Sequence, residues 1–206
     1  MNFVRSFTKG FANIACHILY KIKIDGLENI PKEGAALLCS NHIHALDSVV
    51  YVIHFKRMIY MMAKQELFKT KFKSWFLTKM GCFPVKRGAA SEEAINIAVN
   101  HLKDGELVGI FPEGTRNGFA KGVKFKKGVA LIAIKAGVPI IPMGISGTFK
   151  PFSKITIHIG KPIDTSMYNG EEINPRDIVT LTNKSMEEVK KLVSITNEKF
   201  TLNKAK

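Results

Sequence analysis

Short apolar runs alternate along the chain with longer stretches in which apolar residues recur at helical spacing. The short runs predict buried strands: AALLC at 35–39, MIYMM at 58–62, FPV at 83–85, LVGIF at 107–111 and PIIPMGI at 139–145. The helical stretches lie between them, near 46–55, 71–79, 91–103 and 126–136. Strands that alternate with helices in this way are typical of a mainly parallel sheet covered by helices, so we predict an α/β fold.

Two later segments complete the pattern. ITIHIGKPI at 155–163 alternates with period two and predicts a further strand, and residues 175–199 predict a closing helix. No stretch rich in Pro, Gly or Ser divides the 206 residues, and no internal repeat is present. We therefore predict a single domain.

The first 22 residues predict an amphipathic helical segment ahead of that domain. Its apolar residues recur at helical spacing: Phe3, Val4, Phe7, Phe11, Ile14 and Ile18. Two interpretations fit this pattern, a helix that lies in a membrane interface and a helix that packs on the core. The apolar run at 11–20 is far shorter than the roughly 20 residues that span a bilayer, so we expect it not to cross one. It also lacks a small-residue cleavage site, so we expect the segment to be retained.

The formal net charge of +14, from 31 Lys and Arg against 17 Asp and Glu, favours an anionic partner. Nucleic acid, anionic lipid and a phosphorylated substrate would all fit. A non-catalytic binder of nucleic acid or anionic lipid is one hypothesis, supported by the cluster Lys121, Lys124, Lys126 and Lys127. No RNP, KH, helix-turn-helix or zinc-finger pattern is present, so we expect no nucleic-acid partner.

Three cysteines, widely spaced and without a CxxC pair, suggest neither a disulfide framework nor a zinc ribbon. A reducing cytosolic face fits this usage best.

His42 and Asp47 predict a base with its orienting carboxylate. On a continuous helix their spacing would place the side chains about 140 degrees apart, so a turn must separate them. If residues 41–45 form a turn between strand and helix, Asp47 can bond one imidazole nitrogen and leave the other to accept a proton. No GxSxG elbow is present, so we expect the activated hydroxyl to belong to the substrate.

The same segment also fits a metal site, because His42, His44 and Asp47 offer alternate imidazoles and a nearby carboxylate. A hydrolytic metal centre needs further ligands. The other candidates lie in predicted helices or strands without a second clustered motif: His54, His101 and His158. We therefore expect neither a metal nor a bound cofactor.

FPEGTR at 111–116 brings a carboxylate, a flexible backbone, a hydroxyl and a guanidinium together at a predicted strand end. Arg116 can grip a phosphate bidentately, while Thr115 and nearby backbone N–H groups add donors. Glu113 can orient that arginine or hold a substrate hydroxyl. The alternative is a surface turn with an ion pair.

Polar segments follow four of the predicted strands: CSNHIHALD, AKQEL, KRG and PEGTRN. In open α/β sheets, ligands bind beyond the carboxyl ends of the strands. We therefore predict that these four strand ends converge on one site.

Four motifs in this order resemble those of the glycerolipid acyltransferase family: NHIHALD (41–47), GCFPVKR (81–87), FPEGTR (111–116) and VPIIP (138–142). The resemblance covers roughly residues 35–165, and the FPEGTR form is more similar to lysophosphatidic acid acyltransferases than to glycerol-3-phosphate acyltransferases. His44 stands where members commonly carry Ser, and GCFPVKR lacks an Ile-Asp pair that many carry before the arginine. Neither departure removes a group that the mechanism requires, but both bear on the choice of acceptor.

The resemblance also implies which residues form the site. His42 would be the general base and Asp47 its orienter. The glycerol phosphate would be bound by Lys64, Arg87, Glu113, Gly114, Thr115 and Arg116. From the residues themselves we expect an acyltransferase domain at 23–206 behind a membrane-interface helix at 1–22, and we expect VPIIP to serve in packing more than in chemistry.

The reaction implied by the resemblance is O-acylation. A fatty acyl group would pass from acyl-CoA or acyl-carrier protein to the free sn-2 hydroxyl of lysophosphatidic acid and give phosphatidic acid. Glycerol 3-phosphate and other lysophospholipids are the alternative acceptors. Because acceptor and product are lipids, we expect the chain at an anionic membrane surface, peripheral or monotopic on the cytoplasmic face of the cell membrane.

Overall fold

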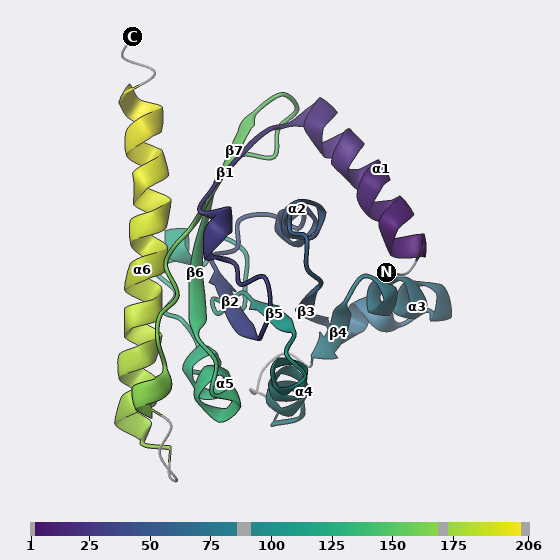
Figure 1. Cartoon of the computed structure of the whole chain (residues 1–206). Helices are drawn as coiled ribbons and strands as arrows, with labels where there is room; N and C mark the ends of the chain where they lie inside the picture. The colour runs from purple at the N-terminus through teal and green to yellow at the C-terminus, as the bar shows by residue number, and fades with distance from the viewer. Residues whose placement is uncertain (1–2, 86–91, 169–172, 203–206) are drawn as a thin grey trace.

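The computed structural model describes residues 3–85, 92–168 and 173–202 (Figure 1). Within these residues a seven-stranded sheet has the order β1-β7-β6-β2-β5-β3-β4. Each neighbouring pair is parallel except β6 and β7. The strands are β1 (Lys21–Asp25), β2 (Ala36–Ser40), β3 (Ile59–Lys64), β4 (Cys82–Val85), β5 (Leu107–Ile110), β6 (Ile140–Gly147) and β7 (Lys154–Ile159).

Helices cover both faces of the sheet. Val99 of α4, Val129 of α5 and Leu181 of α6 belong to the core on one face. Cys16 of α1 and Tyr51 of α2 belong to the core on the other. The helices are α1 (Phe3–Leu19), α2 (Asp47–His54), α3 (Lys71–Lys79), α4 (Glu92–Lys103), α5 (Gly128–Ala136) and α6 (Pro175–Leu202).

The central strand β2 is buried at every position. Leu37 and Cys39 face the core beneath α4 and α5, whereas Ala36 and Leu38 face the core beneath α2. A parallel strand covered on both faces needs an apolar side chain at nearly every position, which is why AALLC reads as an unbroken apolar run.

The predicted fold, a single α/β domain with a mostly parallel sheet, is confirmed. Each predicted strand and helix occurs, with ends that differ by a few residues. β1 was not predicted, because KIKID is short and alternates lysine with isoleucine. It becomes a strand by pairing with β7, from Lys21 beside Lys154 to Asp25 beside His158.

The N-terminal helix ends at Leu19, and the predicted division between residues 22 and 23 falls inside β1. Its apolar stripe is 63% to 70% exposed at Phe7, Phe11, Ile14 and Ile18, so this stripe does not pack on the core. Cys16 is buried instead, and Lys9 Nζ donates a hydrogen bond of 2.6 Å to the Phe55 carbonyl. Of the helices in the described part of the chain, none combines the length and the apolar character needed to cross a membrane.

Candidate active site

The predicted polar segments follow strands that lie side by side. β2, β5, β3 and β4 are neighbours in that order and parallel to one another. Because parallel strands end at the same edge of a sheet, residues 41–47, residues 111–116 and Lys64 are brought to one edge. The fourth segment contains Arg87, which lies outside the described residues.

His42 and Asp47 form the predicted pair. The turn after β2 brings His42 Nδ1 to 2.7 Å from Asp47 Oδ2. The same oxygen accepts hydrogen bonds from the backbone N–H groups of Ile43 (2.7 Å) and His44 (2.9 Å). Asp47 is fully buried, whereas the His42 side chain is 18% exposed. With Nδ1 donating to the carboxylate, Nε2 is left as the nitrogen that can accept a proton.

Phe111 fixes the plane of the His42 ring. The two rings are stacked, with centroids 4.1 Å apart and an angle of 14° between their planes. Phe111 comes directly after β5 and was not predicted as a site residue. Its place at the start of FPEGTR was the only sign in the sequence that it could reach the site.

Glu113 ties the loop after β5 to the turn after β2. Its Oε1 accepts the backbone N–H of His42 and its Oε2 accepts that of Phe119, both at 2.9 Å. The backbone N–H of Asn117 in turn donates to the His42 carbonyl at 2.6 Å. Both backbone polar groups of His42 are therefore held by residues 113–117.

The Glu113 carboxylate points inward, with 2% of the residue exposed. Burial raises the pKa of this carboxyl, and the N–H groups of His42, Phe119 and Gly118 oppose that rise. Gly118 leaves space for the carboxylate, because an added Cβ would overlap Glu113 Oε2. Glu113 therefore lies beneath the loop that the sequence predicted to bind substrate.

A cationic hollow of about 430 Å³ is lined in part by Ile43 and His44, which follow His42 in the turn after β2. It brings together three of the predicted binding residues, Lys64, Thr115 and Arg116. Four further residues line it that were not among the residues implied to bind the glycerol phosphate: Ile43, His44, Asn117 and Lys121. The described residues of the lining supply three cations and the Thr115 hydroxyl, and they include no carboxylate. This combination suits a phosphate group.

Gly114 lies at the surface of the same loop. Its φ of +65° favours glycine, and an added Cβ would come within 2.8 Å of Lys126 Nζ. The loop conformation thus needs this glycine whether or not its backbone contacts a ligand.

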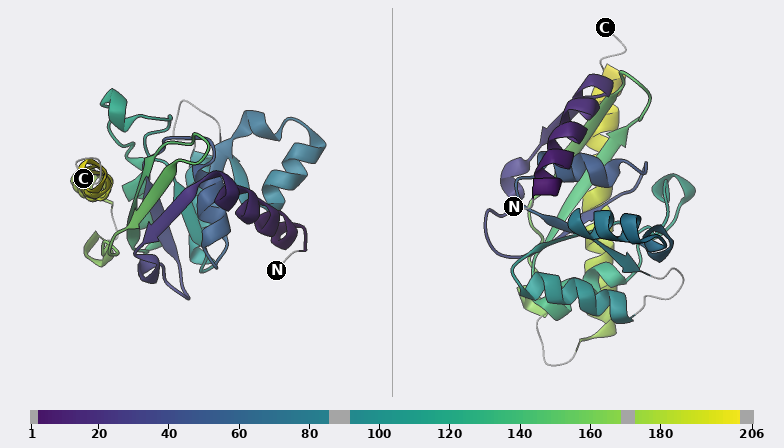
Figure 2. Two further views of the ribbon diagram at one scale, coloured as in Figure 1. Left: turned by 90° about the horizontal axis from the view of Figure 1, so that it is seen from above. Right: turned by 90° about the vertical axis from the view of Figure 1, so that its right-hand side faces the viewer.

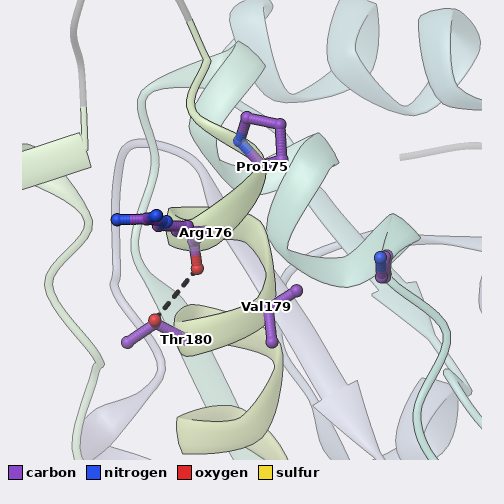
Figure 3. A pocket seen from close by; sticks show the side chains of 5 residues that line it. Pro175, Arg176, Val179 and Thr180 are labelled. Carbon is purple, nitrogen blue, oxygen red and sulfur yellow. Dashed lines mark hydrogen bonds between the residues drawn. The ribbon is translucent and has the colours of Figure 1, made fainter.

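A second hollow lies at the start of α6 (Figure 3). It is lined by Lys127, Pro175, Arg176, Val179 and Thr180. The Thr180 hydroxyl donates to the Arg176 carbonyl at 2.9 Å, a bond within the helix. None of the predicted site residues lines this hollow.

The metal alternative depended on His44 joining His42 and Asp47. His44 Nδ1 instead accepts the Leu46 N–H at 3.3 Å, and its ring stacks on Phe149 at 4.4 Å. Among the described residues, no group of three His, Cys, Asp or Glu side chains is placed to hold one ion.

A model of the Acyltransferase family matches residues 21–146, a range that contains all four motifs. A 1-acyl-sn-glycerol-3-phosphate acyltransferase of Borreliella burgdorferi is 35% identical over 136 residues, which are 65% of this chain and 54% of that protein. The protein of the same name from Bacillus subtilis is 32% identical over 149 residues, 69% of this chain and 73% of that protein. The alignment thus spans about half of the first relative's length.

Among solved structures, the 1-acyl-sn-glycerophosphate (LPA) acyltransferase of Thermotoga maritima superposes with a TM-score of 0.73. It is 27% identical, and the match covers 94% of this chain and 79% of that one.

Proposed function

Since the chain belongs to the Acyltransferase family, we propose that it transfers a fatty acyl group from an acyl thioester to the sn-2 hydroxyl of lysophosphatidic acid. The observation that carries the proposal is the His42–Asp47 contact of 2.7 Å beside a hollow lined by Lys64, Thr115 and Arg116. A base for the hydroxyl and a hollow lined by cations suit an acceptor that carries both a hydroxyl and a phosphate. The product is phosphatidic acid.

In the proposed mechanism His42 Nε2 removes the proton from the acceptor hydroxyl as its oxygen attacks the thioester carbonyl. A tetrahedral intermediate forms and collapses, which breaks the carbon–sulfur bond. The leaving thiolate takes the proton back from the imidazolium. Asp47 stabilises that imidazolium and keeps Nε2 pointed at the hydroxyl, while Phe111 holds the ring plane.

The acceptor phosphate is bound, in this proposal, by Arg116, Lys64 and Thr115, with Gly114 shaping the loop. Arg87 is proposed as a further ligand from its motif alone. Glu113 contributes to the acceptor site through the loop that it holds. The donor is acyl-CoA or acyl-carrier protein, and the reaction takes place at an anionic membrane surface on the cytoplasmic face.

A panel assay tests this function. Purified protein in vesicles is given several acyl thioesters with lysophosphatidic acid, glycerol 3-phosphate and other lysophospholipids, and products are identified by mass spectrometry. We expect transfer to lysophosphatidic acid above the other acceptors. Transfer to a different acceptor would correct the substrate, and no transfer by the folded protein to any acceptor would reject the function.

Arg116→Lys should raise the apparent KM for lysophosphatidic acid by roughly tenfold, about the loss of one charge-assisted hydrogen bond. Lysine keeps the charge but loses the planar bidentate fork of arginine. Steady-state kinetics with lysophosphatidic acid and with monoacylglycerol, which lacks the phosphate, makes the comparison. Equal effects on the two acceptors would contradict a phosphate role.

Incubation with the acyl donor alone should leave the protein without a covalent acyl group. Burial raises the pKa of the Cys39 thiol, and it raises the pKa of Cys82 to about 11, so neither supplies a thiolate near neutral pH. Intact-mass measurement decides the point. A stoichiometric adduct that forms and disappears at the turnover rate would show that the chemistry is different.

A further inference from the structure

Helix α3 carries large apolar side chains that the fold leaves uncovered. None of the nine residues of α3 is buried. Phe72 is 72% exposed and Trp75 is 47% exposed, and their ring centroids lie 6.1 Å apart. Leu67, in the turn before the helix, is 48% exposed. Contiguous exposed apolar side chains on a soluble domain mark a surface that contacts something.

The charged residues in and next to this patch are mostly basic. Residues 65–79 carry four lysines and a single acidic residue, Glu66. The lysines are Lys69, Lys71, Lys73 and Lys79, and none of them forms an ion pair with another described residue. Aromatic side chains surrounded by free lysines complement an anionic lipid surface, where the rings enter the interface and the ammonium groups meet headgroups.

Helix α3 lies on the same side of the molecule as helix α1. Figure 1 and the right-hand view of Figure 2 place α1 and α3 on one side, with α6 on the opposite side. On α1, Phe11, Ile14 and Ile18 are 63% to 70% exposed, and the helix contains no acidic residue. Two separate helices on one side of the molecule, each with exposed apolar side chains, suit a broad partner such as a bilayer.

The patch is joined directly to the acceptor hollow. Lys64 lines that hollow at the end of β3, and the turn Gln65–Phe68 that leads into α3 starts at the next residue. We propose that α3 and this turn are a second membrane contact, which holds the mouth of the hollow against the anionic surface that supplies the acceptor. The acceptor part of this inference rests on the proposed function.

The test compares a double variant, Phe72→Ser with Trp75→Ser, with a matched control on the opposite side. The control is Val179→Ser with Ile195→Ser on α6, where both residues are 40% exposed. Sedimentation with vesicles of phosphatidylglycerol and phosphatidylcholine measures binding, and circular dichroism checks folding. We expect the α3 variant to bind roughly tenfold more weakly and the α6 control to bind like the parent.

Acyl transfer separates this inference from the proposed function. The α3 variant should lose activity on lysophosphatidic acid carried in vesicles but keep parental activity on a short-chain acceptor dissolved as monomers. If the parent transfers no acyl group to either acceptor, the function fails, while the binding comparison still decides the contact. Parental vesicle binding by the folded α3 variant, or an equal loss in the α6 control, would overturn the contact.

Discussion

His42→Ala should abolish turnover. A general base contributes roughly 100-fold to 10,000-fold to the rate, and we expect kcat to fall by at least that factor. The substitution removes Nε2 but keeps the backbone N–H and carbonyl that bond to Glu113 and Asn117. We therefore expect the variant to fold and to bind the acceptor. Single-turnover kinetics and acceptor binding measured on the same preparation check both parts.

Asp47→Asn is the companion variant. Asp47 Oδ2 accepts three hydrogen bonds, and Oδ1 is buried without a hydrogen-bond partner among the described residues. The side-chain oxygen of asparagine can accept the three hydrogen bonds that Oδ2 accepts now. Its NH2 group would take the place of Oδ1, where no described residue accepts a hydrogen bond, and the negative charge would be lost. We expect a severe loss of turnover with a smaller loss of stability. Near-normal turnover by folded His42→Ala would remove the mechanism altogether.

Glu113→Gln should lower kcat on the order of 100-fold and raise the acceptor KM to a smaller extent, because the loop that Glu113 holds also carries Thr115 and Arg116. Glutamine keeps the size of the side chain but turns an amide donor toward the N–H of His42 or of Phe119. An unpaired buried N–H costs about 1–3 kcal/mol, which unfolding by heat or denaturant measures. A base displaced by roughly 1 Å can account for a loss of this size in kcat.

The exposed Glu33→Gln serves as the control, because it removes the same charge at a surface position. It should change neither kcat nor stability. If Glu113→Gln raises the acceptor KM and leaves kcat alone, Glu113 contacts the acceptor directly and its role in holding His42 is wrong.

Local patterns were enough to predict most of the fold. The strands that are buried on both faces read as apolar runs because each position faces a core, as in β2. β1 could not be predicted in this way, since KIKID has a lysine at alternate positions and becomes a strand through its partner β7. That pairing joins residues more than 130 positions apart, and no local pattern records it.

In the site, too, contacts between residues close in the sequence could be predicted, and contacts between distant residues could not. The contact of His42 with Asp47 is local, and the need for a turn between them follows from their spacing. The bond from the His42 N–H to Glu113 joins residues 71 positions apart. The sequence therefore pointed to Glu113 as a partner of Arg116 or of the substrate, and not as a partner of His42. The stacking of Phe111 on His42 was hidden for the same reason, since an aromatic residue at a strand end usually reads as core.

The two bonds between the His42 backbone and the loop at 113–117 have a consequence for protein engineering. A chimera in which only this loop is exchanged with that of a relative, in order to change the acceptor, would also replace the residues that hold the His42 backbone. Both bonds are kept if segments 41–47 and 111–118 are transferred together. Segment 111–118 includes Gly118, which leaves space for Glu113. Libraries that vary the loop should therefore hold Glu113 and Gly118 constant and diversify the positions that face the hollow.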